Sequence, residues 1–354
     1  MKNLMKTTLS IAAIAILPVL SFAQGKSIYG EDNRLDFFAA SQEMKTLSDS
    51  VVSFWKASSI ETLNPGGVKL KTANFGERLN LCPGEKFREQ PIGAFCSGSL
   101  VGPDLVMTAG HCVKTEADCQ NTKLVFGYAV KTNGGEATTA MPASEVYTCT
   151  KIVKRFLGGE PGSANPAGQA LGSDFALIKL DRKVTGHKPL PINRGANLKK
   201  GDGIFVIGHP VGLPLKVAGG ASVRDFSKVG YFTADLDTFG GNSGSPVFNA
   251  RTKKIEGILV RGDEDFIDSP AGCTTMATYA QTGGRGEDVT KISALSPFIT
   301  KTGFLDRFLL FLQYLPQSLT AAEKAQAKSL GEGVDLSAIQ AEMDVTPVKA
   351  VTFD

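Results

Sequence analysis

Short apolar segments separated by turn-forming residues follow one another along most of this chain of 354 residues. A first series comprises AFCSGSLV, LVMTAGHC, KLVFGYAV, VYTCTKIV and DFALIKL, and it begins after Gly93. A second series comprises GIFVIGH, LKVAGGASV, VGYFTADL, SPVFN and KIEGILV. Segments of this length between Gly, Pro, Asn and Asp are typical of strands, and helix-forming runs are few before residue 300. The pattern predicts an all-β body.

The strands fall into two groups of about six, because Val51–Trp55 adds one strand to the first series. Two such groups indicate two packed antiparallel β-barrels or a long sandwich. We place the barrels at residues 51–183 and 200–293. The stretch from Leu157 to Gly172 is rich in Gly, Pro, Ala and Asn, and it reads as an exposed loop.

The chain changes character after residue 293. The run from Phe304 to Leu315 is strongly apolar at helical spacing, and Thr320–Glu323 has the form of a capping box. We expect a C-terminal helical extension over residues 294–354 that packs against the β-rich body.

The first 23 residues have the features of a signal peptide. Lys2 and Lys6 precede an apolar stretch from Leu9 to Leu20, and small residues flank Phe22. The apolar stretch is too short to span a bilayer, so we expect export to the periplasm or beyond rather than a stable membrane anchor. Residues 24–50 form an N-terminal segment that is either a short propeptide or part of the mature chain.

Charge argues against nucleic acid as a partner. The chain has 38 basic and 35 acidic residues, and removal of Lys2 and Lys6 leaves 36 against 35. A nearly neutral mature chain lacks the basic surface that phosphate binding requires. We expect a monomer that acts on proteins or peptides and needs no cofactor.

The six cysteines are even in number, which in an exported chain indicates disulfides. No pair has C-x-x-C spacing and the chain has only three histidines, so a zinc site is disfavoured.

Three short runs carry the residues of nucleophilic catalysis. They are MTAGHC with His111, GSDFALIKL with Asp174, and GGNSGSP with Ser243. A serine hydroxyl needs a general base, and the base needs an acid that fixes its tautomer. The backbone N–H groups of Gly241 and Ser243 are candidate donors to the carbonyl oxygen that becomes negative.

These runs resemble the trypsin-like (chymotrypsin-fold) serine peptidases, and among them the bacterial branch of glutamyl endopeptidases. The order His, Asp, Ser is the same, and the resemblance covers residues 51–293. It implies two barrels of chymotrypsin type and a serine endopeptidase. His111 is then the general base, Asp174 its orienting acid and Ser243 the nucleophile, while Gly241 and Ser243 form the oxyanion hole.

The resemblance also implies a disulfide between Cys96 and Cys112, which flank the histidine region. Pairing of the neighbouring strands favours Cys119 with Cys149, and elimination leaves Cys82 with Cys273. Asn242 stands where mammalian-type relatives carry an acid that binds a newly cut N-terminus. We therefore expect that activation does not depend on such an ion pair.

The substrate pocket is expected at Asp237, Thr238 and Arg261. In trypsin-like members an acid six residues before the nucleophile holds Arg or Lys, which favours cleavage after these residues. Arg261 is expected near the opposite wall, where it either pairs with Asp237 or selects an acidic side chain.

Other readings of these residues are open to test. His209 is a rival to His111, whereas His187 lies in a polar turn and is expected to be solvated. The acids Asp263, Glu264 and Asp265 are expected to be solvated as well. The alternative function is a catalytically silent, peptidase-like binding protein. An α/β-hydrolase is excluded because its triad has the order Ser, Asp, His.

Overall fold

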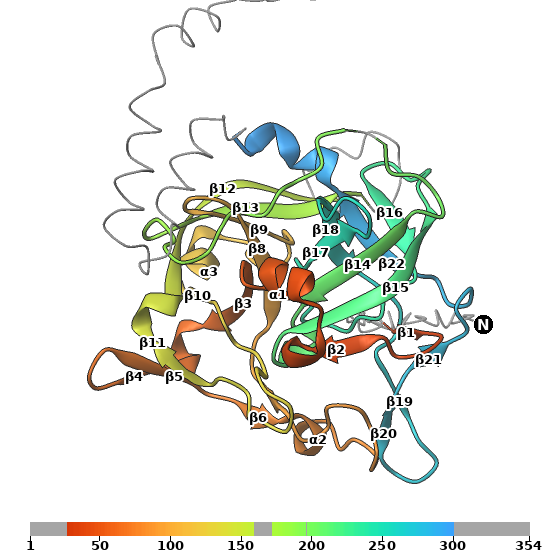
Figure 1. Ribbon diagram of the computed structural model, residues 1–354, viewed down its shortest axis with the longest axis horizontal. Coiled ribbons are helices and arrows are strands. Elements are labelled where there is room, and N and C mark those ends of the chain that lie inside the picture. The colour runs from red at the N-terminus through yellow and green to blue at the C-terminus, as the bar shows by residue number, and fades with distance from the viewer. Residues whose placement is uncertain (1–26, 159–171, 196, 301–354) are drawn as a thin grey trace, which may run out of the picture. The chain divides into compact units, whose positions relative to one another are not determined.

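A computed structural model describes residues 27–158, 172–195 and 197–300 (Figure 1). The expected signal peptide, most of the expected loop between Leu157 and Gly172, and the expected C-terminal helices lie outside the described residues.

Six antiparallel strands close into a first barrel in the order β3-β8-β9-β13-β12-β10. All seven residues of β8 are buried, and β3 and β13 are buried except for one residue each. The strands are β3 (Val51–Lys56), β8 (Cys96–Gly102), β9 (Leu105–Thr108), β10 (Thr122–Val125), β12 (Val146–Leu157) and β13 (Asp174–Leu180).

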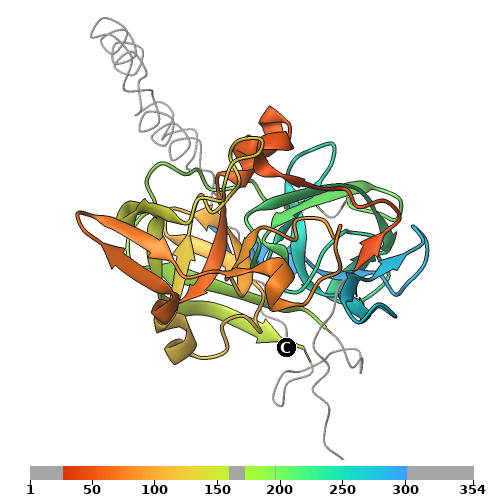
Figure 2. The same cartoon turned by 90° about the horizontal axis from the view of Figure 1, so that it is seen from below.

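A second barrel closes in the order β14-β17-β18-β22-β16-β15, because β14 also pairs with β15. Figure 2 shows the first barrel in orange to yellow-green and the second in green to blue. Its strands are β14 (Gly203–Gly208), β15 (Lys216–Asp225), β16 (Tyr231–Ala234), β17 (Pro246–Asn249), β18 (Ile255–Arg261) and β22 (Glu287–Lys291). The expected fold of two six-stranded barrels is confirmed.

The N-terminal segment belongs to the second barrel as much as to the first. Strand β2 (Arg34–Asp36) pairs antiparallel with β15, and β1 (Ile28–Tyr29) pairs parallel with β21 (Thr278–Tyr279). Helix α1 (Gln42–Ser48) follows, capped by the Ser41 hydroxyl, and leads into β3 of the first barrel. The segment therefore crosses from one barrel to the other.

Smaller elements decorate the barrels. The added strands are β4 (Ile60–Leu63), β5 (Gly67–Leu70), β6 (Ala73–Asn74), β7 (Pro91–Ile92), β11 (Ala140–Pro142), β19 (Phe266–Asp268) and β20 (Thr274–Met276). The further helices are α2 (Phe75–Arg78) and α3 (Glu116–Gln120). Turns of 3₁₀ helix occur at Phe37–Ala39, Ala57–Ser59, Ala143–Glu145, Pro210–Gly212, Ile292–Ala294 and Ser296–Phe298.

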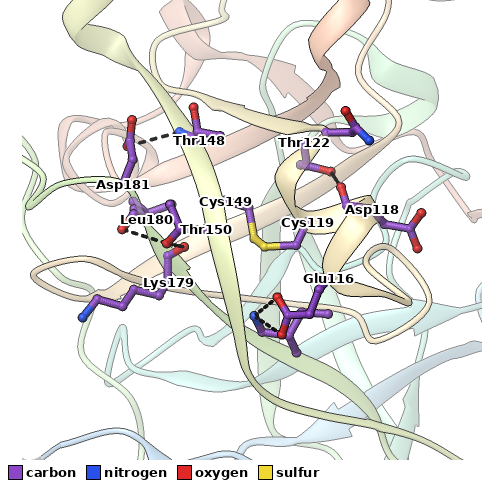
Figure 3. The surroundings of a disulfide bond; sticks show 12 residues. Glu116, Asp118, Cys119, Thr122, Thr148, Cys149, Thr150, Lys179, Leu180 and Asp181 are labelled. Atoms are coloured by element: carbon purple, nitrogen blue, oxygen red, sulfur yellow. Dashed lines mark hydrogen bonds between the residues drawn. A yellow bond between two sulfur atoms is a disulfide. The ribbon is translucent and has the colours of Figure 1, made fainter.

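Three disulfides use all six cysteines and have the expected pairing. Cys96–Cys112 and Cys119–Cys149 lie within the first barrel, with Cα–Cα distances of 6.2 and 5.0 Å. Figure 3 shows the second of these joining α3 to β12. Cys82–Cys273 ties the chain that precedes the first barrel's β8 to the β19–β20 hairpin, across 191 residues of sequence.

The largest apolar cluster is continuous between the barrels, since it contains Phe54 and Leu177 of the first and Phe205 and Ile258 of the second. This cluster fixes the seam between the barrels, while a separate cluster with Val206, Phe232 and Val289 fills the second barrel. Among the described helices none is long and apolar enough to cross a membrane.

Candidate active site

A carboxylate and an imidazole meet at the seam between the barrels. His111 Nδ1 lies 2.7 Å from Asp174 Oδ2, and the Asp174 side chain is fully buried. The imidazole is 22% exposed, so one side of it faces solvent. With Nδ1 engaged by the carboxylate, Nε2 is the nitrogen left to exchange a proton with a nucleophile.

The carboxylate is held by backbone groups as well. Asp174 Oδ1 accepts hydrogen bonds from the N–H groups of Gly110 at 2.6 Å and His111 at 3.2 Å. The Thr290 hydroxyl of β22 accepts a hydrogen bond from Asp174 N–H and donates one to Asp174 O, each at 2.9 Å. Asp174 therefore begins β13 of the first barrel while a strand of the second barrel fixes its backbone.

Ser243 lies in the loop between β16 and β17, next to the turn that carries His111. Its carbonyl oxygen accepts from Ser97 N–H at 2.9 Å and is 3.6 Å from Cys112 Sγ. A Cβ on the next residue, Gly244, would lie 2.9 Å from the backbone nitrogen of Ala109, two residues before His111. This glycine lets the two catalytic segments touch.

The loop before Ser243 contains Gly241, the expected donor of the oxyanion hole. Gly241 has a φ of +79°, which favours glycine, and Val211 N–H donates to Gly240 O at 2.5 Å. The C=O and N–H of a trans peptide point in opposite directions, so this bond turns Gly241 N–H away from Val211. No described residue accepts a hydrogen bond from Gly241 N–H, which leaves it available to an oxygen of a substrate.

A strained turn supports that loop from behind. Val211 has a φ of 54°, which is rare for a β-branched residue and persists only where the surroundings enforce it. The Ser97 hydroxyl donates to Gly241 O at 2.9 Å and accepts from His209 N–H at 3.0 Å. Ser97 thus joins the first barrel, this turn and the glycine loop.

Asp237, expected at the substrate pocket, is buried and bonded to the N-terminal segment. Its two carboxylate oxygens accept from the N–H groups of Tyr29 and Asn33, each at 2.8 Å, and the residue is 2% exposed. Burial raises the pKa of Asp237 to about 6. The carboxylate anchors the N-terminal segment to the loop that carries Ser243.

Arg261 does not form an ion pair with Asp237. Its Nε is 3.1 Å from Asp288 Oδ2, and its Nη2 donates to Gly172 O at 2.9 Å. Thr238 does lie beside an acid, since its hydroxyl donates to Glu287 Oε2 at 2.7 Å. Glu287 was not predicted from the sequence, because its segment EDVTK does not have the apolar pattern of a buried strand.

The N-terminal segment also contributes a buried cation that sequence reasoning missed. The Arg34 guanidinium is fully buried, forms two bonds with the Asp32 carboxylate, and stacks over Phe239 at 4.3 Å from the ring centroid. Close by, buried Lys216 is 2.7 Å from Asp36. Buried charges of this kind are stable only when paired, so they hold the segment against the second barrel.

The other two histidines are engaged elsewhere. His209 Nδ1 is 3.0 Å from Leu213 O, and burial lowers the pKa of His209 to about 3, so it is a neutral residue of the core. His187 is not solvated as expected. It is bonded to Asp49 at 3.0 Å and Glu145 at 2.8 Å and stacks on Phe126.

One group of described side chains has atoms close enough together to hold a metal ion. Cys96, His111 and Cys112 bring their sulfur and nitrogen atoms within 4.8 Å, but the sulfurs form a disulfide and offer no thiolate.

Asp265, one of the acids expected to be solvated, has a structural contact instead, because its Oδ2 accepts from Gly240 N–H at 2.8 Å.

Two six-stranded barrels with a His–Asp pair at their seam and a serine loop beside it define the class of chymotrypsin-fold proteins. Residues 96–258 match the family described as a trypsin-like peptidase domain. The match supports the resemblance of this part of the chain to the chymotrypsin-fold serine peptidases.

Glutamyl endopeptidases are among the known proteins to which this chain is similar. Glutamyl endopeptidases of Staphylococcus aureus strains are 28% identical over 179 residues, which is 47% of this chain and 43–47% of theirs. The match therefore spans less than half of those relatives. A solved Glu endopeptidase in complex with MPD has a TM-score of 0.41 at 18% identity, over 77% of this chain and 96% of that one. The Vibrio cholerae VesB protease has a TM-score of 0.43 at 16% identity, over 76% and 66%.

Proposed function

We propose that this chain is an exported serine endopeptidase in which His111, Asp174 and Ser243 form a catalytic triad. The observation that carries the proposal is the fully buried Asp174 carboxylate at 2.7 Å from His111 Nδ1, with the Ser243 backbone against the same turn. The Ser243 hydroxyl attacks the peptide carbonyl while His111 takes its proton, and the alkoxide oxygen is held by the N–H groups of Gly241 and Ser243. His111 then protonates the leaving amine, and water hydrolyses the ester.

A fluorophosphonate probe tests the nucleophile directly. We expect the wild-type protein to be labelled and Ser243→Ala to remain unlabelled, with Ser245→Ala as the matched control that keeps labelling. Ser245 is fully buried and its hydroxyl donates to Asn242 Oδ1, so it is a structural serine. Absence of label on a folded wild-type protein would support the silent binding protein instead.

For the residue before the scissile bond, we propose Arg or Lys, with Asp237 and Glu287 as the selecting acids. The Glu287 carboxylate is fully buried, accepts from the Thr238 hydroxyl at 2.7 Å and the Tyr29 hydroxyl at 3.3 Å, and lies against Gly262. A buried carboxylate at this wall gives the pocket a negative potential, which favours a cation and disfavours an acid.

Peptides with Lys, Arg, Glu, Phe or Ala before the scissile bond test this preference. We expect Lys and Arg to be cut best, and Glu287→Gln to reduce that preference without abolishing cleavage of the Ala peptide. The relatives named glutamyl endopeptidases suggest glutamate instead, and preferential cleavage after Glu would overturn the proposal for this pocket.

Export is supported by the three disulfides, which persist in oxidising compartments. Cell fractionation tests it, with the protein expected in the periplasm or the medium. We also propose a monomer, which light scattering of the purified protein tests.

A further inference from the structure

One buried hydroxyl of the first barrel contacts two segments of the second barrel. Ser97, the second residue of β8, is fully buried. Its hydroxyl accepts from His209 N–H at 3.0 Å, at the start of the strained turn that contains Val211. Because a backbone N–H can only donate, the single hydroxyl proton is left for Gly241 O, 2.9 Å away. The direction of both hydrogen bonds is therefore fixed.

The backbone of Ser97 holds the same loop at a second point. Its N–H donates to Ser243 O at 2.9 Å, and its own carbonyl oxygen accepts from the Thr108 hydroxyl at 2.7 Å. Ser97 thus bonds the carbonyl groups of Gly241 and Ser243, the two residues whose N–H groups are proposed to stabilise the substrate oxygen. It is therefore bonded on both sides of Asn242, in the part of the loop that carries the proposed donors.

The turn at Val211 decides where Gly241 N–H points. Val211 N–H donates to Gly240 O, and the N–H of that same peptide group, which is Gly241 N–H, points the opposite way. The turn and the loop are in direct contact, because a Cβ on Gly241 would lie 2.8 Å from His209 O. A φ of 54° is unfavourable for valine, so relaxation of the turn would lower its free energy unless other contacts restrain it. The bond from His209 N–H to the Ser97 hydroxyl is one such restraint.

Strand β8 does not itself require a bonded hydroxyl at a buried position. Ser99 lies two residues further along, so it is on the same face of the strand, and it is also fully buried. Its hydroxyl has no hydrogen-bond partner among the described residues. Ser97 and Ser99 therefore share residue type, strand and burial, and they differ in what their hydroxyls contact. A comparison of the two isolates the contribution of those contacts.

We propose that Ser97 is a positioning residue for the oxyanion hole, because its hydroxyl holds the Val211 turn and Gly241 in the arrangement that leaves Gly241 N–H available to the substrate. Without this hydroxyl, His209 N–H and Gly241 O both lose a partner, which favours a rearranged turn. Ser97 acts through Gly241 and takes no part in bond making. The inference rests on the proposed peptidase activity and gives a first-barrel side chain a role in the part of the site that lies in the second barrel.

The variants Ser97→Ala and Ser99→Ala test the proposal. Each removes one oxygen atom from a buried site, so both are expected to fold, which urea unfolding verifies. We expect Ser97→Ala to lower kcat by about twentyfold and to change KM by less than about twofold, since the oxyanion hole acts in the transition state. Ser99→Ala should leave both constants at their wild-type values. An equal kcat in wild type and Ser97→Ala would overturn the proposal.

Two inhibitors separate positioning of the oxyanion hole from a general loosening of the site. With a peptide aldehyde, Ser243 Oγ adds to the carbonyl carbon, its proton passes to His111, and the new oxyanion lies in the hole. The corresponding peptide alcohol has no carbonyl group and binds without forming this bond. Ser97→Ala should weaken binding of the aldehyde by about twentyfold and of the alcohol by less than about twofold. Equal losses for the two inhibitors would also overturn the proposal.

The strained turn provides a further variant. Glycine adopts a φ near 54° without strain, so Val211→Gly removes the tendency of the turn to relax. Added to Ser97→Ala, it should raise kcat about threefold above that of Ser97→Ala alone. A double variant no better than Ser97→Ala would refute the part of the proposal assigned to the turn. A wild-type protein that neither cleaves peptides nor binds the aldehyde would instead refute the proposed peptidase activity, and this inference would fail with it.

Discussion

The two barrels support their parts of the active site by different kinds of bond. In the first barrel the Cys96–Cys112 disulfide encloses the turn of His111, and Cys119–Cys149 fixes the helix that follows. In the second barrel no disulfide lies within the described loop of Ser243. Its loop is held instead by Asp237, by Arg34 over Phe239 and by the strained Val211 turn.

The difference shows that one site can be preorganised by two strategies. A covalent bridge acts on residues close in sequence and reduces the freedom of the unfolded chain. Buried hydrogen bonds and charges act across more than 200 residues, and they place a loop only after both partners have folded.

The largest expected effect is on the His–Asp pair of the first barrel. Asp174→Asn removes the charge that orients His111, so we expect kcat to fall by about four orders of magnitude with the fold retained. Asp181→Asn is the matched control, because this acid directly follows the same strand and its carboxylate bonds Thr148 N–H and Arg182. A loss of less than tenfold in Asp174→Asn would show that catalysis does not use the pair.

The covalent support comes next. Replacing Cys96 and Cys112 by Ala should lower the free energy of unfolding by about 3 kcal/mol, as expected for a loop of this length, and should also lower kcat. Replacing Cys119 and Cys149 should cost a similar amount of stability and leave kcat nearly unchanged. Urea unfolding and steady-state kinetics measure both quantities. Equal losses of kcat in the two variants would contradict a specific role for the bridge around His111.

Loss of the non-covalent support of the Ser243 loop should lower kcat rather than raise KM. Asp237→Asn loses one of two acceptors for the N-terminal segment, and the displaced glycine loop should lower kcat by about tenfold with KM for the Ala peptide little changed. A peptide aldehyde, which uses the oxyanion hole, should lose the same factor in affinity.

Asp235→Asn provides the control for this variant, because Asp235 is buried on the same segment but bonds Ser222 and Gln281. It should lose stability without this loss of kcat. If Asp237→Asn instead raises KM for Arg and Lys peptides alone, then Asp237 selects the substrate and does not position the loop.

The smallest expected effect concerns His187, which joins segments of the first half of the chain. Burial alone would lower the pKa of His187. Hydrogen bonds with Asp49 and Glu145 outweigh burial and raise this pKa to about 9. The folded state thus binds the proton more tightly than the unfolded chain, whose histidine has a pKa near 6.5. The stabilisation is complete below pH 6.5 and is lost as the pH rises through 9.

We therefore expect the wild type to lose about 1.5 kcal/mol more stability than His187→Gln between pH 6 and pH 10, a value reduced for the exposure of Asp49. Urea midpoints at several pH values measure the difference. Parallel curves for the two proteins would show that His187 does not titrate in this range.

Local sequence predicted much of the fold and of the site. Apolar segments bounded by turns placed the barrel strands, and the runs around His111, Asp174 and Ser243 pointed to the residues that the structure brings together. Strand β22 was missed because GEDVTKI places Glu287 and Asp288 at buried positions, where a hydrophobic pattern does not reveal them. Strands β1 and β2 are two and three residues long, too short for any periodicity.

The pocket residues were assigned less well, for a physical reason. The spacing of Asp237 from Ser243 places it near the pocket, but its hydrogen-bond partners, Tyr29 and Asn33, lie more than 200 residues earlier. Arg261 similarly pairs with Asp288, 27 residues further on. Side-chain partners of buried charges depend on tertiary packing, which residue spacing alone does not contain.

The hydrogen bond from Tyr29 to Asp237 has a consequence for how the protein is made. Its two ends are 208 residues apart, and the Cys82–Cys273 disulfide closes nearly as long a loop. Contacts of such high sequence separation form late, because the entropy of closing the loop must be overcome first. A chain that is still being synthesised or threaded through a membrane has no Asp237 for its N-terminal segment to meet. The proposed peptidase activity would then appear only in molecules that have finished folding.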